Sequence, residues 1–496
     1  MIMSDYQATI GLEVHAELKT RTKMFCDSLN DPDEQHPNVN VCPVCLAHPG
    51  TLPVANKQAI LDVIRVGLAL GGTVSEVTKF DRKNYFYPDL PKGYQISQYD
   101  QPLVLGGTLK NVRIRRVHLE EDTANLTHVN GGSLVDFNRS GVPLMELVTE
   151  PDFRSADEVA DFARELQLIL RYLGVSDANM EKGQMRIEAN VSLSEKINGP
   201  STDLGANFHD KNGWWKFGTY TELKNINSFK AVHDAVEYEL RRQEEAIKNG
   251  EKLVKETRGW NEAQQKTVSQ RSKEEAHDYR YFPEPDLPPF ETKEFGIDRL
   301  RDELPELPEA KRKRFGNEYG LFGKQLELVI AEPELANFFE EAMSELRELD
   351  ALIYKNHSSL ILNYLTSDLR GLMNDANVDF GDLKFSPENL AHLVLLIAKG
   401  SVTSRQAKDI IAKMFATGAD PEEIIKSENI GVSSDMGEIE AVVTAVIAEN
   451  EAAVHDYKKG KTASLQFLIG KAMAKLKGRA RPETLMDLFK RLLDAA

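Results

Sequence analysis

The first strongly patterned stretch of the sequence, residues 8–18 (ATIGLEVHAEL), alternates between apolar and polar side chains. Successive side chains of a β-strand point to opposite faces of a sheet, so this period of two predicts a half-buried strand. Its polar face carries Glu13, His15 and Glu17. Glu13 and His15 would lie about 7 Å apart along the strand, a spacing that suits two ligands of one metal ion or two groups that hold one substrate. An ordinary solvated strand face is the alternative.

Several later segments repeat the pattern of a carboxylate on an otherwise apolar strand. They are residues 112–122 with Glu120, Glu121 and Asp122 at their end, 141–148 with Glu146, 185–193 with Glu188, and 220–225 with Glu222 beside Lys224. Buried glutamates are uncommon unless they are paired or bind a ligand. One sheet with a shared acidic face explains all of these segments. Carboxylates with an imidazole suit a hard ion such as Mg²⁺, which in turn suggests phosphate chemistry.

All three cysteines lie within residues 26–45. Cys42 and Cys45 form a Cys-x-x-Cys pair, whose turn lets two thiolates face one tetrahedral zinc ion, and Cys26 is a third candidate ligand. Candidates for the fourth ligand are Asp27, His36 and His48. The alternative is a buried or redox-active cysteine pair without metal.

The sequence contains no nucleotide-binding loop of a common type. Residues 460–462 (GKT) resemble the end of a Walker A loop, but His455 stands where its first glycine belongs. No GxGxxG motif follows a predicted strand, and no cysteine outside residues 26–45 is available as a hydrolytic nucleophile. Any nucleotide must therefore be held in another way.

Proline density and periodicity divide the chain. Residues 80–102 mix aromatic residues, prolines and charges without a clean period, which predicts a long loop, either functional or held together by aromatic packing. Clustered prolines after residue 283 exclude a helix and mark a boundary near residue 295. Helical periodicity dominates beyond it, with a second boundary near residues 415–421. We expect an α+β protein with a mixed-sheet domain (1–295), an all-helical domain (296–415) and a helical tail (416–496).

The net charge of −17 is unevenly distributed. Residues 456–496 contain ten Lys or Arg and four Asp or Glu, a local charge of +6, which leaves −23 for the rest of the chain. A basic end on an acidic body suits RNA binding by that end, although a solvated cationic helix surface gives the same count. The absence of a long apolar run and of a signal peptide, and the few cysteines, predict a cytoplasmic protein without membrane contact.

Eight motifs resemble one family, the B subunit of the aspartyl/glutamyl-tRNA(Asn/Gln) amidotransferase, and they follow the family's order along the chain. They are IGLEVH (10–15), CPVC (42–45), FDRKNYFYPD (80–89), YQISQ (94–98), HLEED (118–122), ELKN (222–225), DYRYFPEPD (278–286) and FLIG (467–470). The resemblance implies a cradle-shaped α/β domain followed by a helical domain and a helical tail.

The resemblance also implies an activity. ATP would phosphorylate the side-chain carboxylate of Glu-tRNA(Gln) or Asp-tRNA(Asn), and ammonia would then convert it to the amide of Gln-tRNA(Gln) or Asn-tRNA(Asn). The ammonia would come from an amidase-type glutaminase, the A subunit, which a small C subunit would bridge to this chain in a heterotrimer. Two other interpretations stay open: a metal-dependent phosphohydrolase acting on RNA or nucleotides, and a non-catalytic zinc-knuckle scaffold that binds RNA.

Residue roles follow from the same resemblance. The family's Mg²⁺ ligands correspond to Glu13, His15, Glu121 and Glu146. The implied catalytic residues are Lys83, for phosphate binding or the ammonia gate, Glu121, and Glu188, near a second metal. The implied tRNA contacts in the tail are Lys475, Lys477, Arg479 and Arg481.

The sequence departs from the family's pattern at two places. Cys26-Asp27-Ser28 stands where many members have Cys-x-Cys, so one zinc ligand is lost. Residues 196–215 form a longer segment than is usual, and their composition indicates no role.

Overall fold

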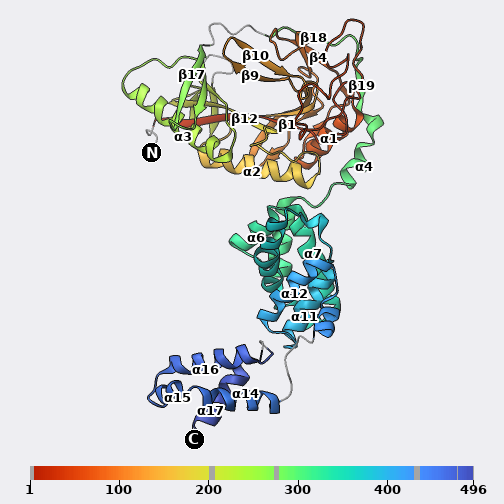
Figure 1. Ribbon diagram of the computed structural model, residues 1–496. Helices are drawn as coiled ribbons and strands as arrows, with labels where there is room; N and C mark the ends of the chain where they lie inside the picture. The colour runs from red at the N-terminus through yellow and green to blue at the C-terminus, as the bar shows by residue number, and fades with distance from the viewer. Residues whose placement is uncertain (1–4, 200–206, 273–278, 429–435, 477–478, 495–496) are drawn as a thin grey trace. The chain divides into compact units, whose positions relative to one another are not determined.

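The computed structural model describes residues 5–199, 207–272, 279–428, 436–476 and 479–494 (Figure 1). The chain forms two compact units, Met1–Pro308 and Glu309–Ala496, and each is described by itself. A mixed sheet dominates the first unit, and the described part of the second unit is built from helices. The predicted α+β fold class is therefore confirmed.

The first unit is organised around a twelve-stranded sheet. Its main path has the order β17-β16-β15-β12-β1-β11-β8-β6-β2, in which β15 and β16 run parallel and β1 pairs antiparallel with both of its neighbours. The strands of this sheet are β1 (Tyr6–Glu17), β2 (Thr73–Val74), β6 (Val104–Leu105), β7 (Thr108–Leu109), β8 (Val112–Glu121), β11 (Pro143–Thr149), β12 (Met185–Ile197), β13 (Asn207–Asp210), β14 (Gly213–Lys216), β15 (Thr221–Lys224), β16 (Glu256–Asn261) and β17 (Lys266–Ser272).

Strand β1 is the predicted alternating segment, and it lies in the middle of this sheet. Its apolar side chains, among them Ile10, Leu12 and Val14, are buried in the core. Three helices contribute to the same core, and Figure 1 shows them along one side of the sheet: α1 (Lys57–Ala69), α2 (Ala156–Tyr172) and α3 (Phe229–Lys248). Because helices cover the apolar face, the acidic face is left available for a site.

The helix boundaries follow from local capping. The side chains of Asn56, Ser155 and Ser228 each accept hydrogen bonds from backbone N–H groups of the first turn, which would otherwise lack partners. Helices α2 and α3 thus begin directly after the capping residues Ser155 and Ser228.

A three-stranded sheet lies on the side of the large sheet away from α2 (Figure 1). It consists of β4 (Asp81–Asn84), β5 (Tyr94–Ser97) and β18 (Tyr281–Pro283), in the order β18-β4-β5. The prediction of a long loop for residues 80–102 was therefore wrong in part, because backbone pairing with a distant segment orders β4. Two further pairs are β9 (Asn125–Val129) with β10 (Gly132–Asp136), and β3 (Val77–Thr78) with β19 (Phe290–Glu291).

The segment 196–215 extends the edge of the large sheet. Strand β12 continues to Ile197, and β13 and β14 form a hairpin that pairs with it. Residues 200–206 of this segment lie outside the described residues.

The first compact unit extends past residue 295, where the proline pattern indicated a boundary. After the 3₁₀ turn η2 (Thr292–Phe295) comes α4 (Ile297–Asp302), whose Leu300 is buried in the core of this unit. Because α4 packs against α1, the division falls at Pro308.

The second unit contains short and medium helices. They are α5 (Pro308–Tyr319), α6 (Gly323–Ile330), α7 (Pro333–Leu349), α8 (Ala351–Tyr354), α9 (Ser358–Asn363), η3 (Tyr364–Leu369), α10 (Arg370–Ala376), η4 (Phe380–Asp382), α11 (Pro387–Ala398), α12 (Ser404–Thr417), α13 (Pro421–Glu428), α14 (Met436–Glu449), α15 (Glu451–Lys458), α16 (Thr462–Lys475) and α17 (Pro482–Asp494). Helix α13 packs against α11 and α12, beyond the second predicted boundary. The last helices share a core of their own that includes Val443, Leu468 and Phe489. None of the described helices combines the length and apolarity needed to cross a membrane.

Candidate active site and metal ligands

Three neighbouring strands bring two histidines and two glutamates together on the acidic face of the large sheet. Pairing places His15 of β1 opposite Glu146 of β11, and Glu146 opposite His118 of β8. Glu120 follows on the same face of β8, two residues after His118. We call His15, His118, Glu120 and Glu146 the histidine–carboxylate cluster.

The distances within the histidine–carboxylate cluster are short. Nε2 of His15 lies 3.4 Å from a carboxylate oxygen of Glu146 and 3.7 Å from one of Glu120. Nε2 of His118 lies 3.3 Å from Glu146. Ligand atoms of His15, Glu120 and Glu146 all lie within 4.8 Å of one another. Two carboxylates and one imidazole at this spacing are a donor set that fits a divalent cation.

The electrostatics of the cluster follow from its burial. Burial opposes charge on Glu146, but His118 and His15 outweigh it and hold the pKa of Glu146 well below its ordinary value. Burial likewise lowers the pKa of His15, yet the carboxylates of Glu146 and Glu120 raise it to about 9. Nδ1 of His118 is buried and has no hydrogen-bond partner in the described part of the chain. The cluster is thus a buried group of charged side chains, in which Nδ1 of His118 still lacks a hydrogen-bond partner among the described residues.

Lys83 of β4 lies near this cluster, as the resemblance implied for a catalytic lysine. Burial disfavours its ammonium form, but Glu120 and Glu146 outweigh burial and leave the pKa of Lys83 above its usual value. The ammonium group also lies 4.9 Å from the ring centroid of Tyr279. Lys83 therefore brings a persistent positive charge to the carboxylates.

Glu121, an expected Mg²⁺ ligand, does not join the cluster. Adjacent residues of a strand point to opposite faces, so Glu121 faces away from Glu120. Its carboxylate pairs with Lys92 at 2.6 Å and accepts the backbone N–H of Ile96 at 2.9 Å. The Mg²⁺ ligand role expected for Glu121 stays a prediction, and it is the neighbouring Glu120 whose carboxylate lies close to His15.

Glu13 and Glu188 form a second polar group beside the first. They lie opposite each other on β1 and β12. The side-chain amide of Asn190 donates to Glu13 at 3.1 Å, and Lys224 pairs with Glu188 at 2.8 Å. Burial, followed by the charges of Glu146 and Glu188, raises the pKa of Glu13. Glu13 is not part of the group of three close ligand atoms found in the described chain.

A cavity of about 400 Å³ adjoins this second polar group. Its lining residues include Glu13, Asn190, Arg115, Ser192 and Tyr220. A cavity of this size with a few convergent polar groups is typical of a small-molecule site.

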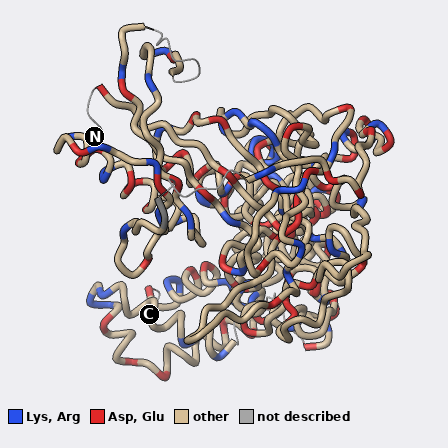
Figure 2. Tube along the Cα trace, turned by 90° about the horizontal axis from the view of Figure 1, so that it is seen from above, with Lys and Arg blue, Asp and Glu red and all other residues tan. Residues whose placement is uncertain are grey.

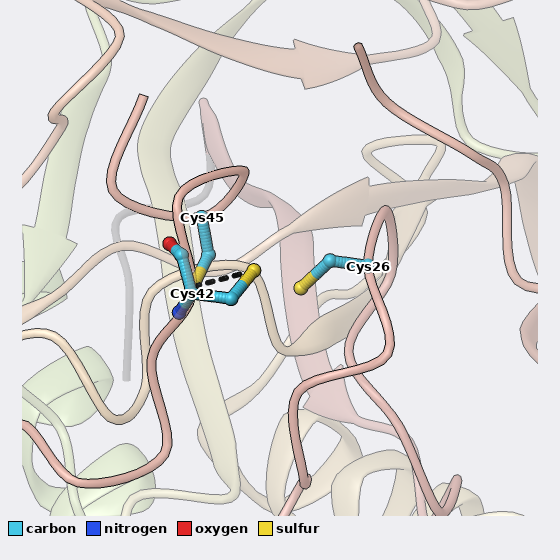
Figure 3. Close-up of side chains that lie close together, drawn as sticks. All are labelled: Cys26, Cys42 and Cys45. Atoms are coloured by element: carbon cyan, nitrogen blue, oxygen red, sulfur yellow. Dashed lines mark hydrogen bonds between the residues drawn. The ribbon is translucent and has the colours of Figure 1, made fainter. Parts of the chain in front are cut away.

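The sulfur atoms of the three cysteines converge, as Figure 3 shows. The Sγ atoms of Cys42 and Cys45 are 3.9 Å apart, and all three sulfurs lie within 4.8 Å of one another. A hydrogen bond from Cys26 and the neighbouring Lys23 lower the pKa of Cys45 to about 4, against the effect of burial. The described residues thus bring together three sulfur atoms that could hold a metal ion.

No fourth protein ligand joins the three sulfurs among the described His, Asp and Glu residues. Asp27, His36 and His48 are exposed instead. A buried ammonium group, that of Lys23, lies 3.8 Å from Sγ of Cys45. The donor set is therefore incomplete for a four-ligand zinc site, and zinc binding stays a prediction.

Three of the four expected tRNA contacts of the tail are engaged within the chain. Lys475 pairs with Glu449 at 2.6 Å and Arg479 with Glu438 at 2.5 Å. The guanidinium group of Arg481 donates to the carbonyl of Gly400 at 3.0 Å. Lys477 lies outside the described residues.

Other cations of the tail are less constrained. Lys458, Lys459 and Lys490 form no ion pair within the described tail. Figure 2 shows that basic and acidic residues are interspersed along the chain. A net charge of the tail alone therefore does not identify the side chains that are available to RNA.

Sequence reasoning did not single out His118 or Glu120, which the structure places beside His15 and Glu146. The motif HLEED gives three acidic residues in a row, and only the pairing of β8 with β11 decides which of them faces His15. The signal that was present is the period of two, which puts His118 and Glu120 on one face.

Comparison with known proteins agrees with these features. A family model described as "GatB/GatE catalytic domain" matches residues 8–298, and one described as "GatB domain" matches residues 337–493. The chain is 44% identical to the B subunit of the aspartyl/glutamyl-tRNA(Asn/Gln) amidotransferase of Carboxydothermus hydrogenoformans, over 98% of this chain and 99% of the relative. It is 45% identical to the protein of the same name from Thermomicrobium roseum, over 99% of each.

One matched region lies in each compact unit of the chain. The matched catalytic region contains the large sheet and the histidine–carboxylate cluster, and the second match covers most of the helical unit. The chain therefore belongs to the family of the B subunit of the aspartyl/glutamyl-tRNA(Asn/Gln) amidotransferase.

Proposed function

We propose that this chain activates and amidates the side-chain carboxylate of a misacylated tRNA, as one component of a glutamine-dependent amidotransferase. The substrate is Glu-tRNA(Gln) or Asp-tRNA(Asn), and the product is Gln-tRNA(Gln) or Asn-tRNA(Asn). The reaction class is an ATP-dependent carbon–nitrogen ligase. The observation that carries the proposal is the histidine–carboxylate cluster with Lys83 beside it, within the region that matches the family's catalytic domain.

The chemistry explains why ATP is needed. A carboxylate is a poor acyl donor, because its oxygen is a poor leaving group. Transfer of the γ-phosphoryl group of ATP to that oxygen gives an acyl phosphate and ADP. Ammonia then attacks the carbonyl carbon, phosphate leaves with the bonding electron pair, and the nitrogen loses a proton. Phosphoryl transfer mostly requires alignment and cations that neutralise developing charge.

His15, Glu120 and Glu146 would hold Mg²⁺, which when bound neutralises charge on the phosphoryl group. Lys83 adds a fixed positive charge at the same carboxylates and orients the phosphoryl oxygens. Glu13 and Glu188 supply carboxylates for a second cation. The nucleotide binds in the adjoining cavity, whose size and mixed lining suit a small ligand.

Partner chains complete the reaction. Ammonia comes from a separate glutaminase (A) subunit, since the chain belongs to the family of the B subunit. The small C subunit links the two larger chains in a heterotrimer. The helical tail holds the tRNA through its unpaired cations, because an acidic body repels the RNA backbone. The assembly acts in the cytoplasm.

The test is amidation by the purified chain assembled with its partner chains. Glutamine, ATP and Glu-tRNA or Asp-tRNA should give the amidated tRNA, and omission of ATP should abolish the product. His15→Ala should abolish product while the partner's glutaminase activity in the absence of tRNA stays unchanged. A chain that hydrolyses RNA or nucleotides without glutamine would instead be a phosphohydrolase. A His15→Ala enzyme with normal activity would indicate a scaffold that binds RNA without catalysis.

A further inference from the structure

A row of tyrosine rings runs along the three-stranded sheet and its loops. Tyr281 stacks on Tyr99 with ring centroids 4.3 Å apart. Tyr279 meets Tyr85 edge to face at 5.9 Å, and Tyr85 stacks on Tyr87 at 5.7 Å. We call these five residues the tyrosine row.

Three residues of the tyrosine row are exposed to solvent although they carry large rings, and Tyr85 and Tyr281 are partly buried. Tyr99 is 53% exposed, Tyr279 49% and Tyr87 45%. Within residues 79–103 and 279–286, the exposed large hydrophobic side chains are all aromatic, and Phe86 at 87% and Phe282 at 43% are the others. Exposed aromatic rings also occur at protein–protein interfaces, so a partner chain is the competing occupant that the test below must separate. An exposed set of flat rings suits the stacking of flat partners.

One end of the tyrosine row reaches the histidine–carboxylate cluster. Tyr281 lies opposite Lys83 in the pairing of β18 with β4. The ammonium group of Lys83 lies 4.9 Å from the ring centroid of Tyr279. Against the effect of burial, the negative charges of Glu120 and Glu146 raise the pKa of Lys83. The row therefore leads from solvent to Lys83, beside the proposed reaction centre.

Cations accompany the rings. The guanidinium carbon of Arg82 lies 4.3 Å from the ring centroid of Tyr94 and 5.7 Å from that of Phe282, on the same three-stranded sheet. Its charge is balanced by Glu284 at 2.7 Å and Asp286 at 3.3 Å, so Lys83 is the cation of this group that faces the proposed substrate. Aromatic rings interleaved with Arg and Lys are the combination that binds single-stranded nucleic acid, since rings stack on bases and cations attract phosphates.

We propose that the tyrosine row stacks the unpaired bases at the 3′ end of the aminoacyl-tRNA and so positions the esterified amino acid at Lys83. This inference rests on the proposed function and adds the residues that hold the end of the substrate. A single-stranded end fits better than a duplex, because bases within a helix are already stacked on one another and are not free to stack on side chains. Stacking also tolerates either of the two tRNA substrates, because every base has a flat face.

The test compares, in the assembled enzyme, a variant that loses two tyrosine rings with a variant that keeps an aromatic ring at both positions. The Tyr99→Ala, Tyr279→Ala double variant should raise KM for the aminoacyl-tRNA by about 5-fold to 100-fold, the range that loss of base stacking gives. Its kcat at saturating tRNA should change much less. The Tyr99→Phe, Tyr279→Phe double variant keeps both rings and should restore KM to within about twofold. Phe322→Ala, which removes an exposed ring of the second unit, is the matched control and should leave KM unchanged.

Two further measurements separate the possible failures. Wild-type chain should bind a single-stranded ACCA oligonucleotide more tightly than a blunt duplex, and the double alanine variant should lose that preference. An unchanged KM and unchanged oligonucleotide binding in the folded double alanine variant would overturn the inference. Loss of the partner chains from that variant, with oligonucleotide binding intact, would also overturn it and assign the row to a protein interface. If the wild-type enzyme lacked amidation activity, the proposed function would fail, and oligonucleotide binding alone would decide the role of the row.

Discussion

Adjacent residues Glu120 and Glu121 offer a sharp test of the site, because they face opposite sides of one strand. Glu120→Gln should remove one of the two carboxylates within reach of His15, at 3.7 Å, while the amide oxygen can still accept the hydroxyl of Ser97, which lies 3.0 Å from the wild-type carboxylate. Loss of one group that stabilises transition-state charge typically lowers kcat by about 10²-fold to 10³-fold. That factor corresponds to roughly 3–4 kcal/mol.

Glu121→Gln should instead lower the stability of the chain and leave its activity largely unchanged. It breaks the charge pair with Lys92, whose side chain is largely buried, and leaves that ammonium group without its carboxylate. Removing one partner of a buried pair costs about 3–5 kcal/mol, and the amide oxygen that remains for Lys92 and Ile96 should reduce this to roughly 1–3 kcal/mol. Stability should therefore fall while the histidine–carboxylate cluster stays intact.

The assays are denaturant unfolding of each variant and steady-state amidation by the assembled enzyme, measured well below the unfolding temperature. We expect Glu120→Gln to be folded and nearly inactive, and Glu121→Gln to be less stable and active. An active Glu120→Gln enzyme together with an inactive, stably folded Glu121→Gln enzyme would refute the assignment and move the chemistry to the opposite face of β8.

Three more predictions follow from the same geometry. Lys83→Gln should lower kcat for amidation by about 10²-fold or more, because a fixed charge beside Glu120 and Glu146 is lost. The tRNA-independent glutaminase activity of the assembled enzyme should stay normal. Parallel loss of both activities would indicate that the variant does not assemble with its partner chains. Chelator treatment should remove any zinc from the three cysteines and lower the unfolding temperature by only about 2–4 °C, since the site lacks a fourth ligand and the large core does not depend on it. Metal analysis and calorimetry measure the two effects. Complete unfolding of the protein on chelation would contradict this prediction. The Lys458→Ala, Lys459→Ala double variant should reduce the slope of log K for tRNA binding against log salt concentration by about one or two. Lys475→Ala should change this slope less, because Lys475 is already paired with Glu449. Equal effects of the two variants would show that the paired cations also contact the tRNA.

The period of two was enough to predict strand β1 and the face on which Glu13 and His15 lie, because alternation depends only on local geometry. The partners of His15 depend on which strands flank β1 and in which register. Pairing brings Glu146 and Glu188 next to β1 from residues more than a hundred positions away, and no local rule fixes that choice. The different surroundings of Glu120 and Glu121 have the same origin, since consecutive glutamates differ only in the face of the sheet that the register exposes.

Long-range pairing also explains the other differences. The sequence of β4 lacks a clear alternation of apolar and polar residues, because this strand is ordered by backbone pairing with β18 (Tyr281–Pro283), which lies far away in the sequence. The proline-rich stretch that indicated a boundary therefore returns to the site and carries Tyr281 toward Lys83. Charge counting predicted a basic tail but not that Lys475 and Arg479 are paired inside it, because a count contains no distances.

The central claim is that the chain activates a carboxylate by phosphoryl transfer, and oxygen-isotope transfer tests it most directly. Glu-tRNA labelled with ¹⁸O in both oxygens of the side-chain carboxylate is amidated by the assembled enzyme with ATP and glutamine, and the inorganic phosphate is analysed by mass spectrometry. An acyl phosphate requires that one labelled oxygen leaves with the phosphate in each turnover, so we predict one ¹⁸O atom per phosphate released. Amide formation that leaves the phosphate free of label would contradict the account, because the carboxylate oxygen would then have departed without being phosphorylated.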